Sequence, residues 1–95
     1  MNFKPNGAIV WFTDGSLTDS GTGAGMYCPL YDYRFSFSLG KHATVFQAEV
    51  YAILMCALFC ISKMYSNRYI YICSDSQAAL KALNSFQISS KIVYE

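Results

Sequence analysis

Apolar residues fall along this chain in two kinds of pattern: short runs typical of strands and longer segments with helical spacing. The short runs are rich in β-branched and aromatic residues, and residues that favour turns bound them. They predict four strands, at Ile9–Thr13, Ala24–Cys28, Tyr33–Leu39 and Tyr69–Cys73. The first run is apolar throughout, which predicts burial on both faces. The third alternates with polar residues, which predicts a half-exposed strand.

Turn-forming residues separate the first three strands. Asp14-Gly15-Ser16 predicts a turn directly after the first strand, and Leu17 to Gly25 reads as a loop dense in Gly, Ser, Thr and Asp. Pro29 ends the second strand, and Leu30-Tyr31-Asp32 predicts another turn. Because the connections are short, the three strands are expected to form an antiparallel meander.

Helical spacing begins after Ala43. Thr44-x-x-Gln47 matches a capping box with Thr44 as the N-cap, and the helix that it opens is expected to end at about Tyr65. Its apolar residues cover most of the helix circumference, as in a helix packed on a sheet. Ser76 starts a shorter helix, Gln77–Leu83, and Ser89–Glu95 reads as the start of a further helix.

The order of these elements predicts an α/β fold. A strand, a helix and a later strand imply a right-handed parallel crossover, so the first and fourth strands should be parallel neighbours in a mixed sheet. Sites in α/β sheets collect at the carboxyl ends of parallel strands. Asp14 and Asp75 follow two such strands, and Glu49 lies about one turn into the crossover helix. The three acids are therefore expected to meet.

Composition is consistent with one small domain of 95 residues. Hydrophobic residues make up 54% and charged residues 14%, so an apolar face is expected to remain for a missing piece of the domain or for a partner. The chain could cover such an apolar face, or an unpaired sheet edge, by associating with a second copy of itself. The net charge of +1 gives no basic signature of polyanion binding.

Cysteine usage and hydropathy bear on the compartment. The four cysteines have no C-x-x-C spacing, which favours buried reduced thiols. The N-terminus lacks the apolar region of a signal peptide. The apolar stretch Val50–Ile61 is shorter than the ~18 residues of a spanning helix. We therefore expect an intracellular protein, in the nucleus or cytoplasm, with no membrane partner.

The three acids themselves indicate metal chemistry. Carboxylates that converge without basic partners repel one another, and a divalent cation removes that conflict. Oxygen ligands without Cys or His favour Mg²⁺ or Mn²⁺, and two such ions can hydrolyse a phosphodiester. Each acid alone also has a simpler explanation. Asp14 could belong to a hairpin turn, Asp75 could cap the second helix, and Glu49 could be favoured by the helix dipole.

Three segments carry these acids in a fixed order: Phe12–Ser16, Phe46–Glu49 and Cys73–Leu80. Together with the Gly-rich loop up to Gly25, they resemble the ribonuclease H domain, in the style of retroviral and non-LTR retrotransposon polyproteins. The resemblance covers roughly Ile9 to Glu95. It implies a ribonuclease H-like fold, with residues 1–8 as a tail and residues 9–95 as a partial domain.

The resemblance also implies an activity. Members of the family hydrolyse the RNA strand of RNA–DNA hybrids through two magnesium ions held by four carboxylates, of which the first three correspond to Asp14, Glu49 and Asp75. Ser16 corresponds to a position that contacts a substrate phosphate, with Gly15 beside it in the same segment. Gln77 corresponds to a polar position in the minor groove, where recognition rests on shape and 2′-hydroxyls.

This sequence departs from the family pattern as well. The family continues with another helix, a fifth strand, a histidine-bearing loop and a last helix with the fourth carboxylate. His42 is not placed to be that histidine, and Phe46 stands where a polar residue is usual. The expectation is a C-terminally truncated domain, without the fifth strand and last helix, of weak or no activity. The alternatives are a catalytically dead remnant that serves as an interaction module, and another nuclease of the superfold, such as a transposase or integrase core.

Overall fold

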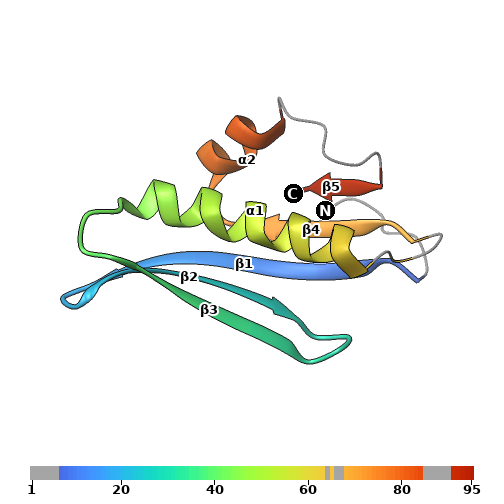
Figure 1. Cartoon of the computed structure of the whole chain (residues 1–95). Helices are drawn as coiled ribbons and strands as arrows, with labels where there is room; N and C mark the ends of the chain where they lie inside the picture. Colours follow the sequence, from blue (N-terminus) through green and yellow to red (C-terminus); the bar gives the residue numbers. More distant parts are fainter. Residues whose placement is uncertain (1–6, 64, 66–67, 85–90) are drawn as a thin grey trace.

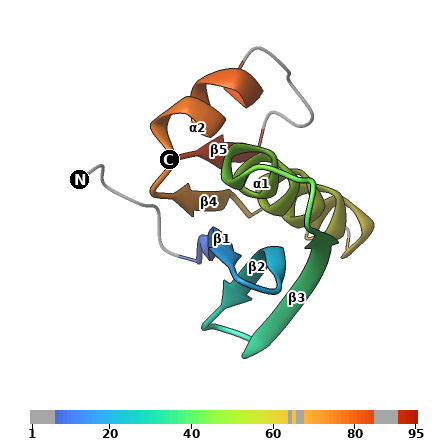
Figure 2. The same ribbon diagram turned by 90° about the vertical axis from the view of Figure 1, so that its left-hand side faces the viewer.

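One five-stranded sheet with two helices forms the fold (Figure 1). The computed structural model describes residues 7–63, 65, 68–84 and 91–95. The strands are β1 (Ile9–Thr18), β2 (Gly21–Cys28), β3 (Tyr33–Gly40), β4 (Ile70–Ser74) and β5 (Ile92–Tyr94). The helices are α1 (Val45–Lys63) and α2 (Gln77–Asn84). Both helices lie on the same face of the sheet, so the described part of the chain forms two layers (Figure 2).

The sheet has the strand order β3-β2-β1-β4-β5. β1, β2 and β3 form an antiparallel meander, and β1 and β4 are parallel neighbours joined by α1. The predicted mixed sheet and its crossover are therefore confirmed. The parallel register ends with Thr13 beside Ser74, where the Thr13 hydroxyl donates to the Cys73 carbonyl oxygen at 3.2 Å.

The first hairpin is longer than the sequence predicts. The expected turn at Asp14-Gly15-Ser16 is wrong, because β1 continues to Thr18 and pairs with β2 as far as Gly21. Most of the predicted loop Leu17–Gly25 is therefore strand. Buried and exposed positions alternate along β1 only as far as Gly15, since Ser16, Leu17 and Thr18 are all exposed. Antiparallel pairing then satisfies the backbone groups, which outweighs the low strand propensity of Gly and Asp.

A fifth strand is present, contrary to the expectation that it is missing and that a helix starts near the end of the chain. β5 pairs in parallel with the outer edge of β4, with Ile70 beside Ile92. The Ile70 N–H donates to the Lys91 carbonyl oxygen at 2.8 Å, and the Glu95 N–H donates to the Ile72 carbonyl oxygen at 2.8 Å. Two β-branched residues and a tyrosine favour a strand in this position, once an unpaired edge is available. The first two residues of the predicted helix, Ser89 and Ser90, lie outside the described residues.

The core lies between the sheet and the helices. Trp11 is fully buried on β1, with the Phe59 ring 5.4 Å away on α1. The fully buried side chains of β1, β2, β4 and α1 meet in this layer: Ile9, Trp11, Cys28, Ile53, Cys56, Cys60 and Ile72. Burial of such side chains contributes about 1.5–3 kcal/mol each, so this layer is the main source of stability.

α1 begins at the predicted capping box. The Gln47 N–H donates to the Thr44 hydroxyl at 3.0 Å, and the Thr44 N–H donates to the Gln47 side-chain oxygen at 2.8 Å. By length and apolar composition α1 could cross a membrane, and 39% of its most apolar window is buried in this fold. The buried face packs on β1, β2 and β4, as a core helix does.

The four cysteines are free thiols, as expected. Cys28, Cys56 and Cys60 are buried, and Cys73 is half-buried. A hydrogen bond with Cys60 and burial both raise the pKa of the Cys56 thiol, and burial raises the pKa of Cys28. Cys28 and Cys56 are therefore protonated at neutral pH and pack as small apolar groups.

Candidate active site

Two of the three acids meet where the parallel strands part. Asp14 directly follows Thr13, the last β1 residue paired with β4, and Asp75 directly follows Ser74 at the other side of that pair. Both carboxylates line one pocket of about 330 Å³. The parallel register therefore brings together two residues that are 61 positions apart in the sequence.

Glu49 approaches the same place from α1, through close contact between the helix and β1. Gly15 makes this contact possible, because a Cβ built there would lie 2.8 Å from the Glu49 backbone nitrogen and 3.0 Å from Ala48 Cβ. The Glu49 side chain is only 9% exposed, unlike those of Asp14 and Asp75. The absence of a side chain at Gly15 thus sets the distance between the helical acid and the strand.

The Glu49 carboxylate has two hydrogen-bond donors. One is the backbone of Gly15, and the other is the Ser74 hydroxyl, 3.5 Å from Oε2. The Ser76 N–H donates to the Ser74 oxygen at 3.1 Å. The Ser74 hydroxyl thus accepts a hydrogen bond from Ser76 and donates its own proton to Glu49. Ser74 was not singled out from the sequence, where only its place before Asp75 marks it.

Burial and the two neighbouring acids both act on Glu49. Burial raises the pKa of Glu49 above its ordinary value, and the negative charge of Asp14 raises it further. Asp75 adds a smaller contribution in the same direction, while the Gly15 and Ser74 hydrogen bonds lower the pKa. A cation placed among the three carboxylates would stabilise the charged form of Glu49, which its surroundings disfavour.

The fit of a metal ion is partial. Among the described residues, no three His, Cys, Asp or Glu side chains are grouped closely enough to hold an ion as they lie. The donor chemistry nevertheless suits a hard divalent cation, since all three groups are carboxylates. Asp14 and Asp75 are exposed, so core packing does not fix their side chains. For all three carboxylates to bind one ion, the side chains of Asp14 and Asp75 would have to change their rotamers.

The simpler explanations for the single acids do not hold in this structure. Asp14 is inside β1 and not in a hairpin turn. The Ser76 hydroxyl caps α2, accepting from the Ala79 N–H at 3.2 Å, so Asp75 is not the N-cap. Glu49 lies beyond the first turn of α1, which contains no acid. None of the three local roles accounts for its residue.

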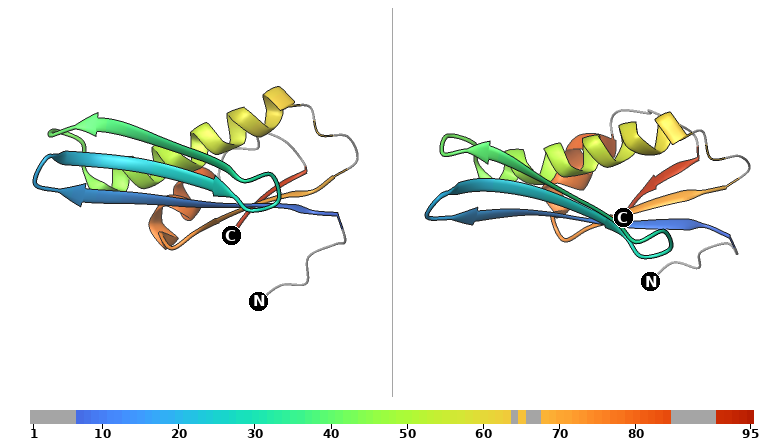
Figure 3. Two further views of the ribbon diagram at one scale, coloured as in Figure 1. Left: turned by 90° about the horizontal axis from the view of Figure 1, so that it is seen from below. Right: turned by 60° about the horizontal axis from the view of Figure 1, so that its bottom comes forward.

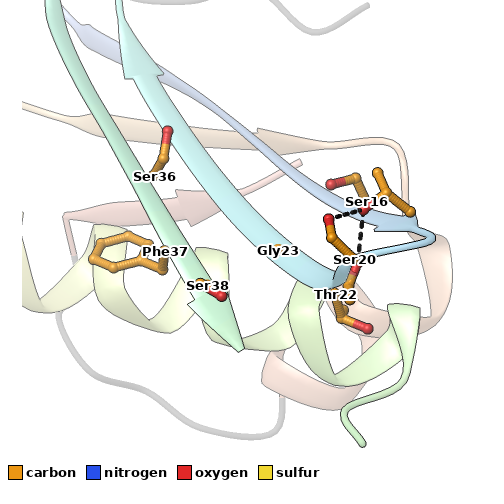
Figure 4. Close-up of a pocket in the computed structure, with 9 residues that line it drawn as sticks. Ser16, Ser20, Thr22, Gly23, Ser36, Phe37 and Ser38 are labelled. Carbon is orange, nitrogen blue, oxygen red and sulfur yellow. Dashed lines mark hydrogen bonds between the residues drawn. The ribbon is translucent and has the colours of Figure 1, made fainter. Parts of the chain in front are cut away.

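The expected substrate-binding residues flank this site. Ser16 is exposed on β1, two residues beyond Asp14, and lines a separate pocket of about 390 Å³ together with Ser36 and Ser38 of β3 (Figure 4). Gln77 is exposed as the first residue of α2, two residues beyond Asp75. Gly15 differs from both, because the space at its Cα is filled by α1.

Known structures share this fold. No protein-family model and no curated protein matches the chain. LC11-RNase H1, isolated from compost by a metagenomic approach, is 13% identical, with a TM-score of 0.73 over 93% of this chain and 82% of that one. The same ribonuclease in complex with an RNA/DNA hybrid gives 13% identity and a TM-score of 0.68, covering 92% and 83%.

A viral structure is similar as well. The foamy viral protease–reverse transcriptase in complex with dsDNA is 24% identical, with a TM-score of 0.64 over 82% of this chain. This chain spans 54% of the length of that viral chain. At these identities the likeness establishes the fold, and the predicted ribonuclease H-like fold is confirmed.

Proposed function

We propose that this chain is a ribonuclease H-type nuclease domain that hydrolyses the RNA strand of RNA–DNA hybrids with Mg²⁺ or Mn²⁺. The observation that carries the proposal is geometric: Asp14 and Asp75 line one pocket, and Glu49 reaches the same place through the Ser74 hydroxyl. Burial and then the charge of Asp14 raise the pKa of Glu49, which is consistent with this arrangement. The fold shared with ribonuclease H1 supports it, and one of those structures contains an RNA/DNA hybrid. The similarity of fold to a foamy viral protease–reverse transcriptase supports a retroelement type of domain.

The residues have separate tasks in this proposal. Asp14, Glu49 and Asp75 would hold the ions, which supply an activated water and stabilise the leaving oxygen of the phosphodiester. Ser16 offers a hydroxyl to a phosphate on the β1 side, and Gln77 offers an amide on the α2 side. The Gly15 backbone and Ser74 hold the Glu49 carboxylate in place.

The proposal is tested by cleavage of a labelled RNA–DNA hybrid. The wild-type chain is expected to cut the RNA strand in Mg²⁺ or Mn²⁺ and to leave single-stranded RNA and double-stranded DNA intact. Asp14→Asn should reduce the rate at least about 100-fold, since it removes a ligand charge at the reacting phosphate. Asp19→Asn is the matched control, because Asp19 is an exposed acid in the β1–β2 turn.

Equal rates for the Asp14→Asn and Asp19→Asn variants would contradict the proposal. Cleavage of DNA duplexes in preference to hybrids would instead assign the chain to another nuclease of the superfold.

A second candidate function is a non-catalytic interaction module. The observation that favours it is that the three carboxylates do not lie as a closed ligand set. This candidate predicts that the folded chain cuts no hybrid at any metal concentration, while it still binds a partner chain.

A further inference from the structure

The outer edge of β3 is the long open edge of the sheet. β3 is eight residues long and is the terminal strand of the sheet, paired on one side with β2. No described element lies beyond it (Figures 1 and 3). α1 packs on β1, β2 and β4 and reaches β3 through ring contacts such as Phe59 with Phe35. The backbone groups on the free side of β3 are therefore accessible.

The sequence of β3 lacks the usual protection of an edge strand. Edge strands commonly carry lysines, prolines or central bulges that prevent pairing with another chain. Tyr33–Gly40 contains neither Lys nor Pro, and its irregularity lies at the Gly40 end. The single charge is Arg34, which lies 4.4 Å over the Tyr27 ring and 3.2 Å from Asp32. Phe35 is 36% exposed although it is a large apolar residue.

We propose that β3 pairs antiparallel with β3 of a second copy of this chain, about a twofold axis at Ser36. In this register Ser36 faces its own copy, Phe35 faces the partner's Phe37, and Arg34 faces the partner's Ser38. Residues that face each other in antiparallel strands lie on the same side of the sheet. The sequence Phe35-Ser36-Phe37 is symmetric about Ser36. In the dimer the sheets of the two copies would form one continuous sheet, with the helices of both copies on the same face.

Charge also selects an antiparallel second copy. β3 has an acid before it, Asp32, and a base after it, Lys41. The antiparallel register brings Asp32 opposite the partner's Gly40, next to the partner's Lys41, and the twofold axis creates this pairing twice. It also keeps the two Arg34 side chains apart. A parallel arrangement in register would instead place Arg34 beside Arg34, a like-charge pair that disfavours it.

The proposed contact uses the outer backbone edge of β3, two strands away from β1. Ser36 and Asp14 share a cross-strand row through Gly25 and line one pocket, but pairing of the β3 edge does not use the Asp14 carboxylate. Dimerisation is therefore expected to persist in the Asp14→Asn variant. A failure of the dimer proposal can thus be distinguished from a failure of the nuclease proposal.

The test is a pair of opposite charges placed at the twofold axis. Ser36 is exposed and lies outside the core, so Ser36→Lys and Ser36→Asp should both fold, which circular dichroism checks. Sedimentation equilibrium under reducing conditions is expected to show a dimer for the wild type. Each variant alone should weaken association at least about tenfold, because like charges face each other across the axis. An equimolar mixture of the two variants should restore the dimer.

The matched control is Ser62→Lys, which adds the same charge at an exposed position of α1 and should leave the dimer unchanged. A wild type that stays monomeric up to roughly 1 mM would overturn the proposal. So would a dimer that withstands Ser36→Lys, or a mixture of the two variants that stays monomeric.

Discussion

At the scale of single residues, the site depends on a glycine, Gly15, at the contact between α1 and β1. Gly15 has no Cβ, and for this reason α1 lies close enough to β1 for Glu49 to reach the Gly15 backbone. Gly25, on the paired strand β2, has no such constraint. A Cβ at Gly25 would meet nothing nearer than the Phe35 carbonyl oxygen at 3.6 Å, an ordinary contact.

This difference gives a matched pair of variants. Gly15→Ala is expected to destabilise the fold by about 1–3 kcal/mol, the usual cost of overpacking, because α1 must move away from β1. Gly25→Ala should be neutral or stabilising by up to roughly 1 kcal/mol, since it mainly restricts the unfolded chain. Urea unfolding measures both. Equal effects in the two variants would show that Gly15 does not set the contact between helix and strand.

The raised pKa of Glu49 makes stability depend on pH. The folded-state pKa lies above the ordinary value of 4.5, so the folded state favours the protonated carboxyl. Its contribution to stability is therefore fully present below about pH 4.5 and is lost as the pH rises through the folded-state pKa. Glu49→Gln keeps a hydrogen-bond acceptor and removes the titration. From pH 4 to 7 in the absence of metal, the Tm of the wild type should fall relative to that of Glu49→Gln, and parallel Tm curves would contradict this.

The juxtaposition of Asp14 and Asp75 could be predicted from the sequence, because each directly follows an apolar run and the two runs pair in parallel up to Thr13 and Ser74. The role of Ser74 could not. A neutral hydroxyl before an aspartate has no distinguishing pattern, and its contact with Glu49 exists only once α1 is packed on the sheet.

At the scale of elements, local chemistry determined which predictions succeeded. The start of α1 follows from two reciprocal hydrogen bonds between Thr44 and Gln47, which are within one turn and need no tertiary contact. β5 depends on a partner far away in the sequence, because its hydrogen bonds go to β4. The two β-branched residues and the tyrosine of β5 favour a strand only weakly, and in so short an apolar segment periodicity alone does not separate strand from helix. The same holds for the second half of β1, whose pairing with β2 overrides its turn-forming residues.

The capping box predicts a measurable contribution to stability. Thr44→Ala removes the acceptor for the Gln47 N–H and should cost about 0.5–2 kcal/mol, measured by thermal or urea unfolding. Ser62→Ala is the control, since its exposed hydroxyl bonds back to the Phe59 carbonyl within the helix and should change stability by less than about 0.5 kcal/mol. A Thr44→Ala variant as stable as the Ser62→Ala variant would show that the cap contributes nothing.

At the scale of the whole molecule, the described chain is a sheet with helices on one face and open strands on the other. The expected absence of a fifth strand would have left the edge of β4 unpaired, but β5 covers that edge. The long open edge is β3, at the opposite side of the sheet. A dimer through β3 would pair backbone groups at this edge and would not use the Asp14 and Asp75 carboxylates, although Asp14 lines one pocket with Ser36 of β3.

The central claim is that Asp14, Glu49 and Asp75 form one site for a divalent cation, and the most direct measurement is the Tm as a function of Mn²⁺ concentration. Saturation to ten times the dissociation constant should add about 1.4 kcal/mol of stability, which raises the Tm by roughly 6–11 °C for a domain of this size. The account predicts this shift for the wild type and for Asp19→Asn, and its loss in Asp14→Asn and Asp75→Asn. An absent shift in the wild type, or the same shift in all four proteins, would contradict it.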